Sequence, residues 1–208
     1  MAKSTKPKGA TSYKETVFGI FPRPKIIQLE KQGVAKGLKY ILKLNSKKAE
    51  ITPQLICGIH KESFGFIFPE WTGKFRTINV AVGDFEPPHF SKVPELVKDL
   101  CADLDERLQH IPPVTKDEKY LKEVVSLLSW FQHQFVWIHP FNDYNGRIAR
   151  LTTNLIALNL GLPAFEIKAV STRDRQKYIK AMKAADKHNL KKLDLLIADA
   201  LKETLQKI

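Results

Sequence analysis

A helical repeat of apolar residues runs through most of this 208-residue chain and restricts its fold more than any other feature. The repeat is clearest in residues 121–136, where apolar side chains recur every three or four positions. That spacing places them on one face of an α-helix. Similar stripes occupy residues 26–44, 93–108, 148–158, 178–185 and 190–205. We therefore predict a mainly α fold whose helices pack through these stripes.

Two shorter patterns complete this prediction. Thr52 followed by Pro53 is typical of a helix start, with Thr52 as the N-cap. Residues 77–83 change to a period of two, which puts their apolar side chains on one face. This pattern, bracketed by glycines, predicts a strand in one short hairpin rather than a large sheet.

The chain divides into a tail and one domain. Residues 1–20 are predicted to form a polar, lysine-rich N-terminal tail. Because residues 1–10 contain lysines but no apolar core, we do not expect a secretory signal there. Residues 21–208 are long enough for a single helical domain, and a hydrophobic content of 43% suffices for a core.

The composition limits the function classes. Lys and Arg number 34 against 22 Asp and Glu, which gives a net charge of +12. This excess suits nucleic acid, an acidic protein, an anionic substrate or simply a solvated surface. Nucleic acid is the least favoured, because the lysines are spread along the chain and no base-reading motif is present. The two cysteines lack the spacing of a metal site, and no apolar stretch approaches the ~20 residues that span a bilayer. We therefore predict a cytoplasmic protein without membrane association.

Residues 139–150 gather groups that suit a polyphosphate. Three consecutive backbone amides are predicted at a helix N-terminus, those of Tyr144, Asn145 and Gly146. Unpaired N–H groups at such a terminus bind anions, the glycine permits close approach, and the Asn145 side chain adds a donor. Arg147 and Arg150 are three residues apart on the first turn, so both can reach the same anion.

Two further side chains in this run suit group transfer. His139 can accept a proton from a hydroxyl, and Asp143 is the kind of oxygen ligand that Mg²⁺ uses. The set therefore favours attack of a hydroxyl on a nucleotide phosphorus. Each residue also has a structural alternative: a histidine that only hydrogen-bonds, an ordinary Asn-Gly turn, and arginines that line a solvated helix face.

The same run resembles the signature of the Fic (Fido) family, His-Pro-Phe-x-Asp/Glu-Gly-Asn-Gly-Arg-x-x-Arg. Every fixed position matches except the first glycine, where this chain has Tyr144. Residues 59–61 and 71–77 resemble the family's segment before its flap, and residues 131–138 resemble its helix before the signature. Residues 173–181 resemble its downstream helix. The likeness covers about residues 50–200 and implies a Fic-type helical bundle with one small β-hairpin flap.

The resemblance implies a protein adenylyltransferase, which moves AMP from ATP to a Ser, Thr or Tyr hydroxyl of a target protein. By position, His139 would be the base and Asp143 would hold Mg²⁺. Arg147 would contact the diphosphate and Arg150 the outer phosphate, beside an anion hole at residues 144–146. The flap would clamp the target backbone by strand addition through Arg76, Thr77, Ile78, Asn79 and Val80.

Tyr144 is the main departure from the family pattern. If the loop requires a positive φ at this position, a Cβ costs roughly 1 kcal/mol or more. The ring would fill space near the phosphates or cover the adenine. Some relatives that lost this glycine transfer other groups, such as phosphate or phosphocholine. Two alternatives therefore stay open: another phosphoryl-type transfer, and a catalytically weak scaffold that binds a nucleotide or a protein.

Regulation is the second departure. Many Fic proteins carry an inhibitory helix of the form Ser/Thr-x-x-x-Glu-Gly/Asn, whose glutamate pairs with the second signature arginine. Residues 11–16, 46–51 and 91–96 match only in part, because none has Gly or Asn after the glutamate. We expect no internal inhibitor of this form, with Arg150 free of any glutamate. The hypothesis is then either a separate antitoxin-like partner or no such control.

Overall fold

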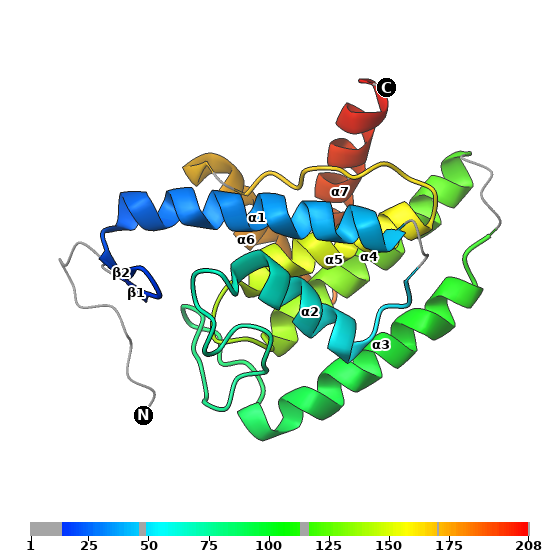
Figure 1. Cartoon of the computed structure of the whole chain (residues 1–208). Coiled ribbons are helices and arrows are strands. Elements are labelled where there is room, and N and C mark those ends of the chain that lie inside the picture. Colours follow the sequence, from blue (N-terminus) through cyan, green and yellow to red (C-terminus); the bar gives the residue numbers. More distant parts are fainter. Residues whose placement is uncertain (1–13, 46–48, 113–116, 170, 208) are drawn as a thin grey trace.

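Helices dominate the computed structural model of this chain, which describes residues 14–45, 49–112, 117–169 and 171–207 (Figure 1). Each apolar stripe predicted from the sequence coincides with a helix, so the mainly α fold is confirmed. The α-helices in the described ranges are α1 (Arg23–Asn45), α2 (Pro53–Phe64), α3 (Val93–Gln109), α4 (Glu118–Ile138), α5 (Asn145–Asn159), α6 (Thr172–Ala185) and α7 (Lys191–Leu205). A 3-10 turn, η1 (Phe90–Lys92), precedes α3.

Helices α4 and α5 form the centre of the bundle. Helix α4 contacts α3, α5 and α7, while α5 also contacts α1 and α2, and α6 packs on α7 (Figure 1). Phe131 and Phe135 of α4 and Leu155 of α5 are fully buried. Residues 139–144 join these two central helices, so the bundle core holds both ends of the loop that carries the signature.

Side-chain caps explain where several helices begin. The Thr52 hydroxyl accepts a hydrogen bond from the Leu55 amide at 3.1 Å, which confirms the N-cap predicted before Pro53. The Asp117 carboxylate accepts from the Tyr120 amide at 2.7 Å at the start of α4. Such caps satisfy amides that the helix itself leaves unpaired.

Two glycines allow α1 to lie against α2 and α5. A Cβ on Gly33 would stand 2.5 Å from the Ser63 carbonyl oxygen, and one on Gly37 would stand 2.6 Å from Leu151. Glycine in a helix interior usually lowers helix stability. Gly33 and Gly37 are instead contact points, because only glycine lets the helix backbones approach this closely.

The β-hairpin lies elsewhere than predicted. Strands β1 (Lys14–Thr16) and β2 (Gly19–Phe21) pair in antiparallel fashion and form the only sheet in the described residues. Residues 77–83, the predicted strand, contain no regular strand; Val82 and Phe85 form one isolated bridge. A strand needs a ladder partner, and the surrounding structure supplies none to this segment.

Residues 14–20 of the predicted tail thus belong to ordered structure, whereas residues 1–13 lie outside the described residues. Cys57 and Cys101 are both free. None of the helices in the described ranges combines the length and apolar content needed to cross a membrane.

Candidate active site

His139 stands where α4 ends. Its backbone is left-handed, with φ 52° and ψ 57°, and its amide donates to the Phe135 carbonyl at 3.1 Å. The ring Nδ1 lies 3.0 Å from the Val136 carbonyl oxygen. Because a carbonyl can only accept, Nδ1 carries the proton, and Nε2 keeps a free lone pair.

The surroundings keep this imidazole neutral. Burial lowers the pKa of His139 below its usual value, and the nearby charge of Arg76 acts in the same direction. These effects outweigh the Val136 hydrogen bond and the charge of Asp143, which raise the pKa. A neutral imidazole with a free Nε2 can accept a proton from a hydroxyl.

The buried side chain of Arg76 fixes the His139 turn. Its Nε donates to the His139 carbonyl at 2.8 Å, and its Nη2 donates to the Pro88 carbonyl at 2.5 Å. Its Nη1 donates to the Ile78 carbonyl at 3.0 Å, and its amide donates to the Pro140 carbonyl at 2.9 Å. Since the residue is only 2% exposed, its side chain anchors the predicted flap to the loop instead of pointing outward.

The other predicted flap residues lie at the surface. Thr77, Ile78 and Asn79 are exposed, and Val80 is half-buried. The Asn79 side-chain oxygen accepts from the Phe90 amide at 3.0 Å. Residues 77–80 thus form an irregular exposed segment that is anchored at both ends.

The N-terminus of α5 faces the loop. The amide of Arg147 donates to the Tyr144 carbonyl at 2.9 Å, whereas the amides of Asn145 and Gly146 have no acceptor among the described residues. Those two N–H groups are available to an anion, with the helix dipole behind them. The Asn145 side chain is not available, because it exchanges two 2.8 Å hydrogen bonds with the backbone of Phe141 and holds the loop closed.

Arg147 pairs with a buried acid from α1. Its Nη2 donates to Glu30 at 2.8 Å, while its Nη1 is buried without a hydrogen-bond partner among the described residues. Glu30 is 2% exposed and also accepts from Arg23 and from the Tyr144 hydroxyl, each at 3.2 Å. A carboxylate of this chain therefore occupies one side of the arginine, and Nη1 is left as a buried donor without an acceptor.

Arg150 has a different environment. Its guanidinium lies 5.7 Å from the ring centre of Tyr178, whose hydroxyl accepts from Gln132 at 2.6 Å. Burial lowers the pKa of this guanidinium. No ion pair in the described part of the chain involves Arg150. The charge of Glu166 raises the pKa of Arg150, against the larger effect of burial. Glu30 is an internal acid at the neighbouring signature arginine, Arg147, and it lies outside the three partial motif matches in the sequence.

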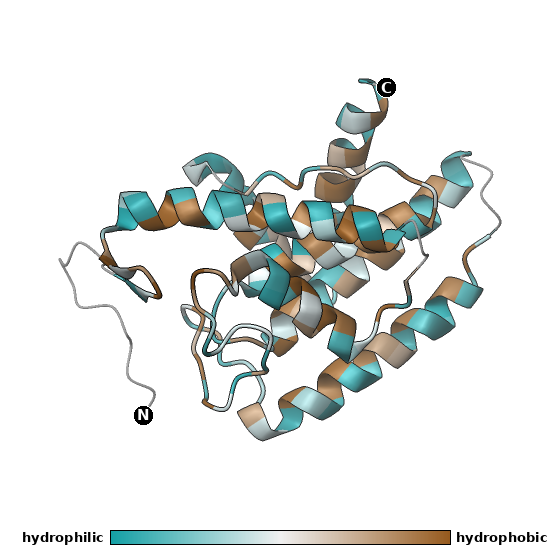
Figure 2. Ribbon diagram, viewed as in Figure 1, coloured by the Kyte–Doolittle hydropathy of each residue, from teal (hydrophilic) through white to brown (hydrophobic). Residues whose placement is uncertain are grey.

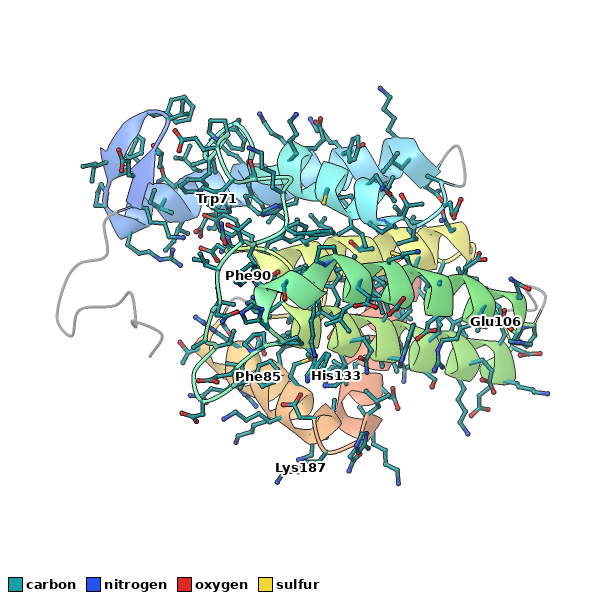
Figure 3. The ribbon with its side chains drawn as sticks, turned by 90° about the horizontal axis from the view of Figure 1, so that it is seen from below. Trp71, Phe85, Phe90, Glu106, His133 and Lys187 are labelled. Carbon is teal, nitrogen blue, oxygen red and sulfur yellow. The ribbon has the colours of Figure 1, made fainter. Side chains whose placement is uncertain are left out.

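Tyr144 occupies the position of the missing signature glycine with φ 66° and ψ 9°. The loop therefore does require a left-handed residue here. The ring is 5% exposed and stacks on Phe64 with 4.0 Å between ring centres, and Trp71 lies 5.9 Å away. Figure 3 shows Trp71 on the side of the molecule that carries α1 and the β-hairpin. Tyr144 thus fills a slot between α2 and the loop.

Asp143 is engaged on both carboxylate oxygens. Its Oδ1 accepts from the Tyr144 amide at 2.7 Å, and its Oδ2 accepts from the Lys14 ammonium at 2.5 Å. Burial raises the pKa of Asp143, but Lys14 and the other partners outweigh it, so the pKa lies below its usual value. The described residues contain no cluster of three or more metal-ligating side chains. One ionised carboxylate still fits Mg²⁺ that arrives on a nucleotide, because phosphates and water supply the other ligands.

His60 supports the loop from α2, and the sequence interpretation gave it no role. It is fully buried, accepts a hydrogen bond from the Gly73 amide at 3.0 Å, and stacks on Phe141 with 3.9 Å between ring centres. Burial lowers its pKa to about 4. This neutral ring positions the loop backbone.

The sequence interpretation missed Glu30, although its position in the apolar pattern could have indicated a buried acid. It lies in register with the buried positions of α1, between Ile26 and Gly33, where a glutamate is unusual. Lys14 had no such signal, because it is one lysine of many in a polar segment.

Comparisons with known proteins agree with this geometry. The Fic/DOC family profile matches residues 50–157. A protein adenylyltransferase Fic of Nematostella vectensis is 33% identical over 149 residues, 71% of this chain and 32% of that protein. One of Aedes aegypti is 29% identical over 83% of this chain and 32% of its own length. The chain thus spans about a third of the length of these curated relatives.

Solved structures show the same fold. C. elegans Fic-1 superposes with a TM-score of 0.65 at 25% identity, over 86% of this chain and 49% of that one. The N-terminal FIC domain of Bep8 from Bartonella sp. 1-1C has a TM-score of 0.68 at 16% identity, over 93% and 92%. With the signature loop, the α4–α5 scaffold and the profile match together, the chain belongs to the Fic/DOC family.

Proposed function

We propose that this chain is a protein adenylyltransferase that moves AMP from ATP to a Ser, Thr or Tyr hydroxyl of a target protein. The observation that carries the proposal is the neutral His139 with a free Nε2 lone pair, in a loop that leads into a helix N-terminus with unpaired amides and Arg147. The names of the relatives at 29–33% identity support the same reaction.

In this reaction the target hydroxyl oxygen attacks the α-phosphorus of ATP, and its proton passes to Nε2 of His139. The bond between the α-phosphorus and the bridging oxygen breaks, so pyrophosphate leaves with the electron pair. The Asn145 and Gly146 amides and the free Nη1 of Arg147 donate hydrogen bonds to phosphate oxygens, which offsets the growing charge. We assign the outer phosphate to Arg150, three residues further along α5.

Mg²⁺ is the metal that we assign to Asp143, where it would neutralise charge on the phosphates. The carboxylate keeps its negative charge because its pKa is lowered. The proposal thus names ATP as the donor substrate and Mg²⁺ as the cofactor.

We assign the exposed residues 77–80 to the target. Thr77, Ile78, Asn79 and Val80 would pair with an extended target segment by strand addition. Arg76 would act by fixing this segment to the His139 turn. Since these contacts involve the backbone, the target would be chosen by shape and by neighbouring surfaces more than by its sequence.

A non-catalytic scaffold is the second candidate, and a specific observation favours it. Tyr144, Glu30 and Lys14 all occupy parts of the site in this structure. A scaffold would bind nucleotide or protein without turnover. Another phosphoryl-type transfer is the third candidate, which the replacement of the signature glycine leaves open.

We also propose that the chain itself contributes to the control of the site. Because Glu30 already occupies Arg147, a separate antitoxin-like inhibitor is not needed to close that side of the site. The free cysteines agree with the expected cytoplasmic location. We treat residues 21–208 as one Fic-type domain, to which the β-hairpin is attached.

The test uses radiolabelled ATP, Mg²⁺ and a cell lysate, with the full chain as enzyme. We expect a labelled protein with the wild type and none with His139→Ala. His110→Ala is the matched control, since His110 is a largely exposed histidine whose side chain pairs with Glu106. Equal labelling by wild type and His139→Ala would exclude the base assignment, and binding of ATP without labelling would favour the scaffold.

A further inference from the structure

We propose that the β1–β2 hairpin is a displaceable plug, in which the Lys14 ammonium takes the place of the divalent cation at Asp143. A docked hairpin and a metal-bound nucleotide then exclude one another. This inference rests on the proposed function only in assigning a metal to Asp143.

The contacts of Lys14 are those of a cation built into the site. Its Nζ lies 2.5 Å from Oδ2 of Asp143, the carboxylate oxygen that the Tyr144 amide leaves free. The same Nζ lies 5.0 Å from the ring centre of Tyr144 and 5.7 Å from that of Phe68. Favourable contacts with a carboxylate and two aromatic rings give the ammonium a defined position.

The same part of the chain also supplies an anion. Glu30, which follows the hairpin on α1, binds Arg147 at 2.8 Å. Lys14 thus places a positive charge at Asp143, where the metal would bind. Glu30 places a negative charge at Arg147, where a phosphate would bind. Two such matches from residues 14–30 favour occupation of the site over an incidental surface ion pair.

The attachment of the hairpin is slight enough for displacement. One backbone hydrogen bond, from the Val17 amide to the Ile67 carbonyl at 3.0 Å, joins it to the loop after α2. Its apolar side chains point mainly outward, with Val17 59%, Phe18 55% and Ile20 67% exposed. Figures 1 and 2 show the hairpin at the edge of the bundle, below the start of α1 and partly brown. A two-stranded hairpin alone is only marginally stable in water, so few contacts need to break.

The first test measures Mn²⁺ binding to the full chain by electron paramagnetic resonance in the presence of a saturating non-hydrolysable ATP analogue, which supplies the phosphate ligands and permits no catalysis. Lys14→Met removes the competing ammonium and should tighten Mn²⁺ binding roughly two- to fivefold, the factor that corresponds to a partly exposed ion pair. Lys36→Met is the matched control, because Lys36 also lies over a ring, that of Phe66 at 3.9 Å, without touching Asp143. Asp143→Asn should abolish the Mn²⁺ signal.

A second variant separates a plug from simple charge repulsion. Gly19 has φ +104° with no atom within 4 Å of an added Cβ, so Gly19→Ala strains the hairpin turn without altering any charge. It should also tighten Mn²⁺ binding, whereas Gly83→Ala, at a similarly open glycine with φ +63°, should not. Hydrogen exchange of the Val17 amide should speed up when Mn²⁺ and a non-hydrolysable ATP analogue are added.

The outcomes separate the two proposals. If Asp143→Asn abolishes Mn²⁺ binding while Lys14→Met and Gly19→Ala both leave it unchanged, the metal site stands and the plug is refuted. A gain with Lys14→Met alone would mean repulsion by charge and would also overturn the plug. If no form of the chain binds Mn²⁺, the plug and the metal assignment fall together, while labelling that depends on His139 would still stand.

Discussion

Substitutions of Tyr144 separate two contributions of this residue to the free energy of unfolding, the packing of its ring and the strain of its left-handed backbone. Its ring is 5% exposed and stacks on Phe64 at 4.0 Å, so its truncation to alanine should cost about 3–5 kcal/mol. Its φ of 66° is left-handed, which costs an L-residue about 1–2 kcal/mol. Glycine avoids that strain. Tyr144→Gly should therefore be less stable than wild type by about 2–4 kcal/mol, yet about 1 kcal/mol more stable than Tyr144→Ala.

The assay is urea unfolding of the three proteins, followed by circular dichroism. Tyr144→Phe is the matched control, because it keeps the stacked ring and loses only the 3.2 Å hydrogen bond to Glu30, at a cost of about 1–2 kcal/mol. If Tyr144→Ala were as stable as Tyr144→Gly, the position would not require a left-handed backbone. If Tyr144→Gly matched wild type, the ring would not pack in the slot described.

Three further predictions follow from the same contacts. The pKa of His60 in the folded chain is lowered to about 4. Between that pH and the ordinary histidine pKa of about 6.5, the unfolded chain therefore binds a proton at His60 that the folded chain does not. Stability should therefore fall by about 2 kcal/mol from pH 7.5 to pH 5 in urea unfolding, and clearly less in His60→Asn; equal slopes would contradict the assignment. Arg76→Met leaves buried carbonyls without a donor and should cost about 2–4 kcal/mol by the same method, against about 0.5 kcal/mol for the exposed Lys74→Met; equal losses would contradict the anchoring role. Glu30→Gln frees Arg147 and should tighten binding of a non-hydrolysable ATP analogue roughly tenfold in calorimetric titration; an unchanged affinity would show that Glu30 does not compete with phosphate.

The helices and the signature loop could be predicted from local signals. The 3.6-residue stripe of α4, the Thr52 cap and the spacing within residues 139–150 are properties of neighbouring residues, and each is found where it was expected. The sequence raised a positive φ at Tyr144 only as a condition, because this residue stands where the family signature has glycine, and the structure shows a φ of 66°. These features depend little on the rest of the chain.

The features that were missed depend on contacts between distant segments. Residues 77–83 alternate like a strand, but a strand forms only with a partner, and Arg76 instead fixes this segment through backbone carbonyls. The ion pair between Lys14 and Asp143 joins residues 129 positions apart, and that between Glu30 and Arg147 joins residues 117 apart. Neither local spacing nor composition predicts which of many charged residues will meet.

The mass added to a modified protein tests the central claim most directly. The full chain, ATP and Mg²⁺ are incubated with a lysate or alone, and the mass of every modified peptide is measured by mass spectrometry. The account predicts a gain of one AMP on a Ser, Thr or Tyr residue, absent with His139→Ala. A gain of one phosphate, or an AMP adduct that forms equally with His139→Ala, would contradict it.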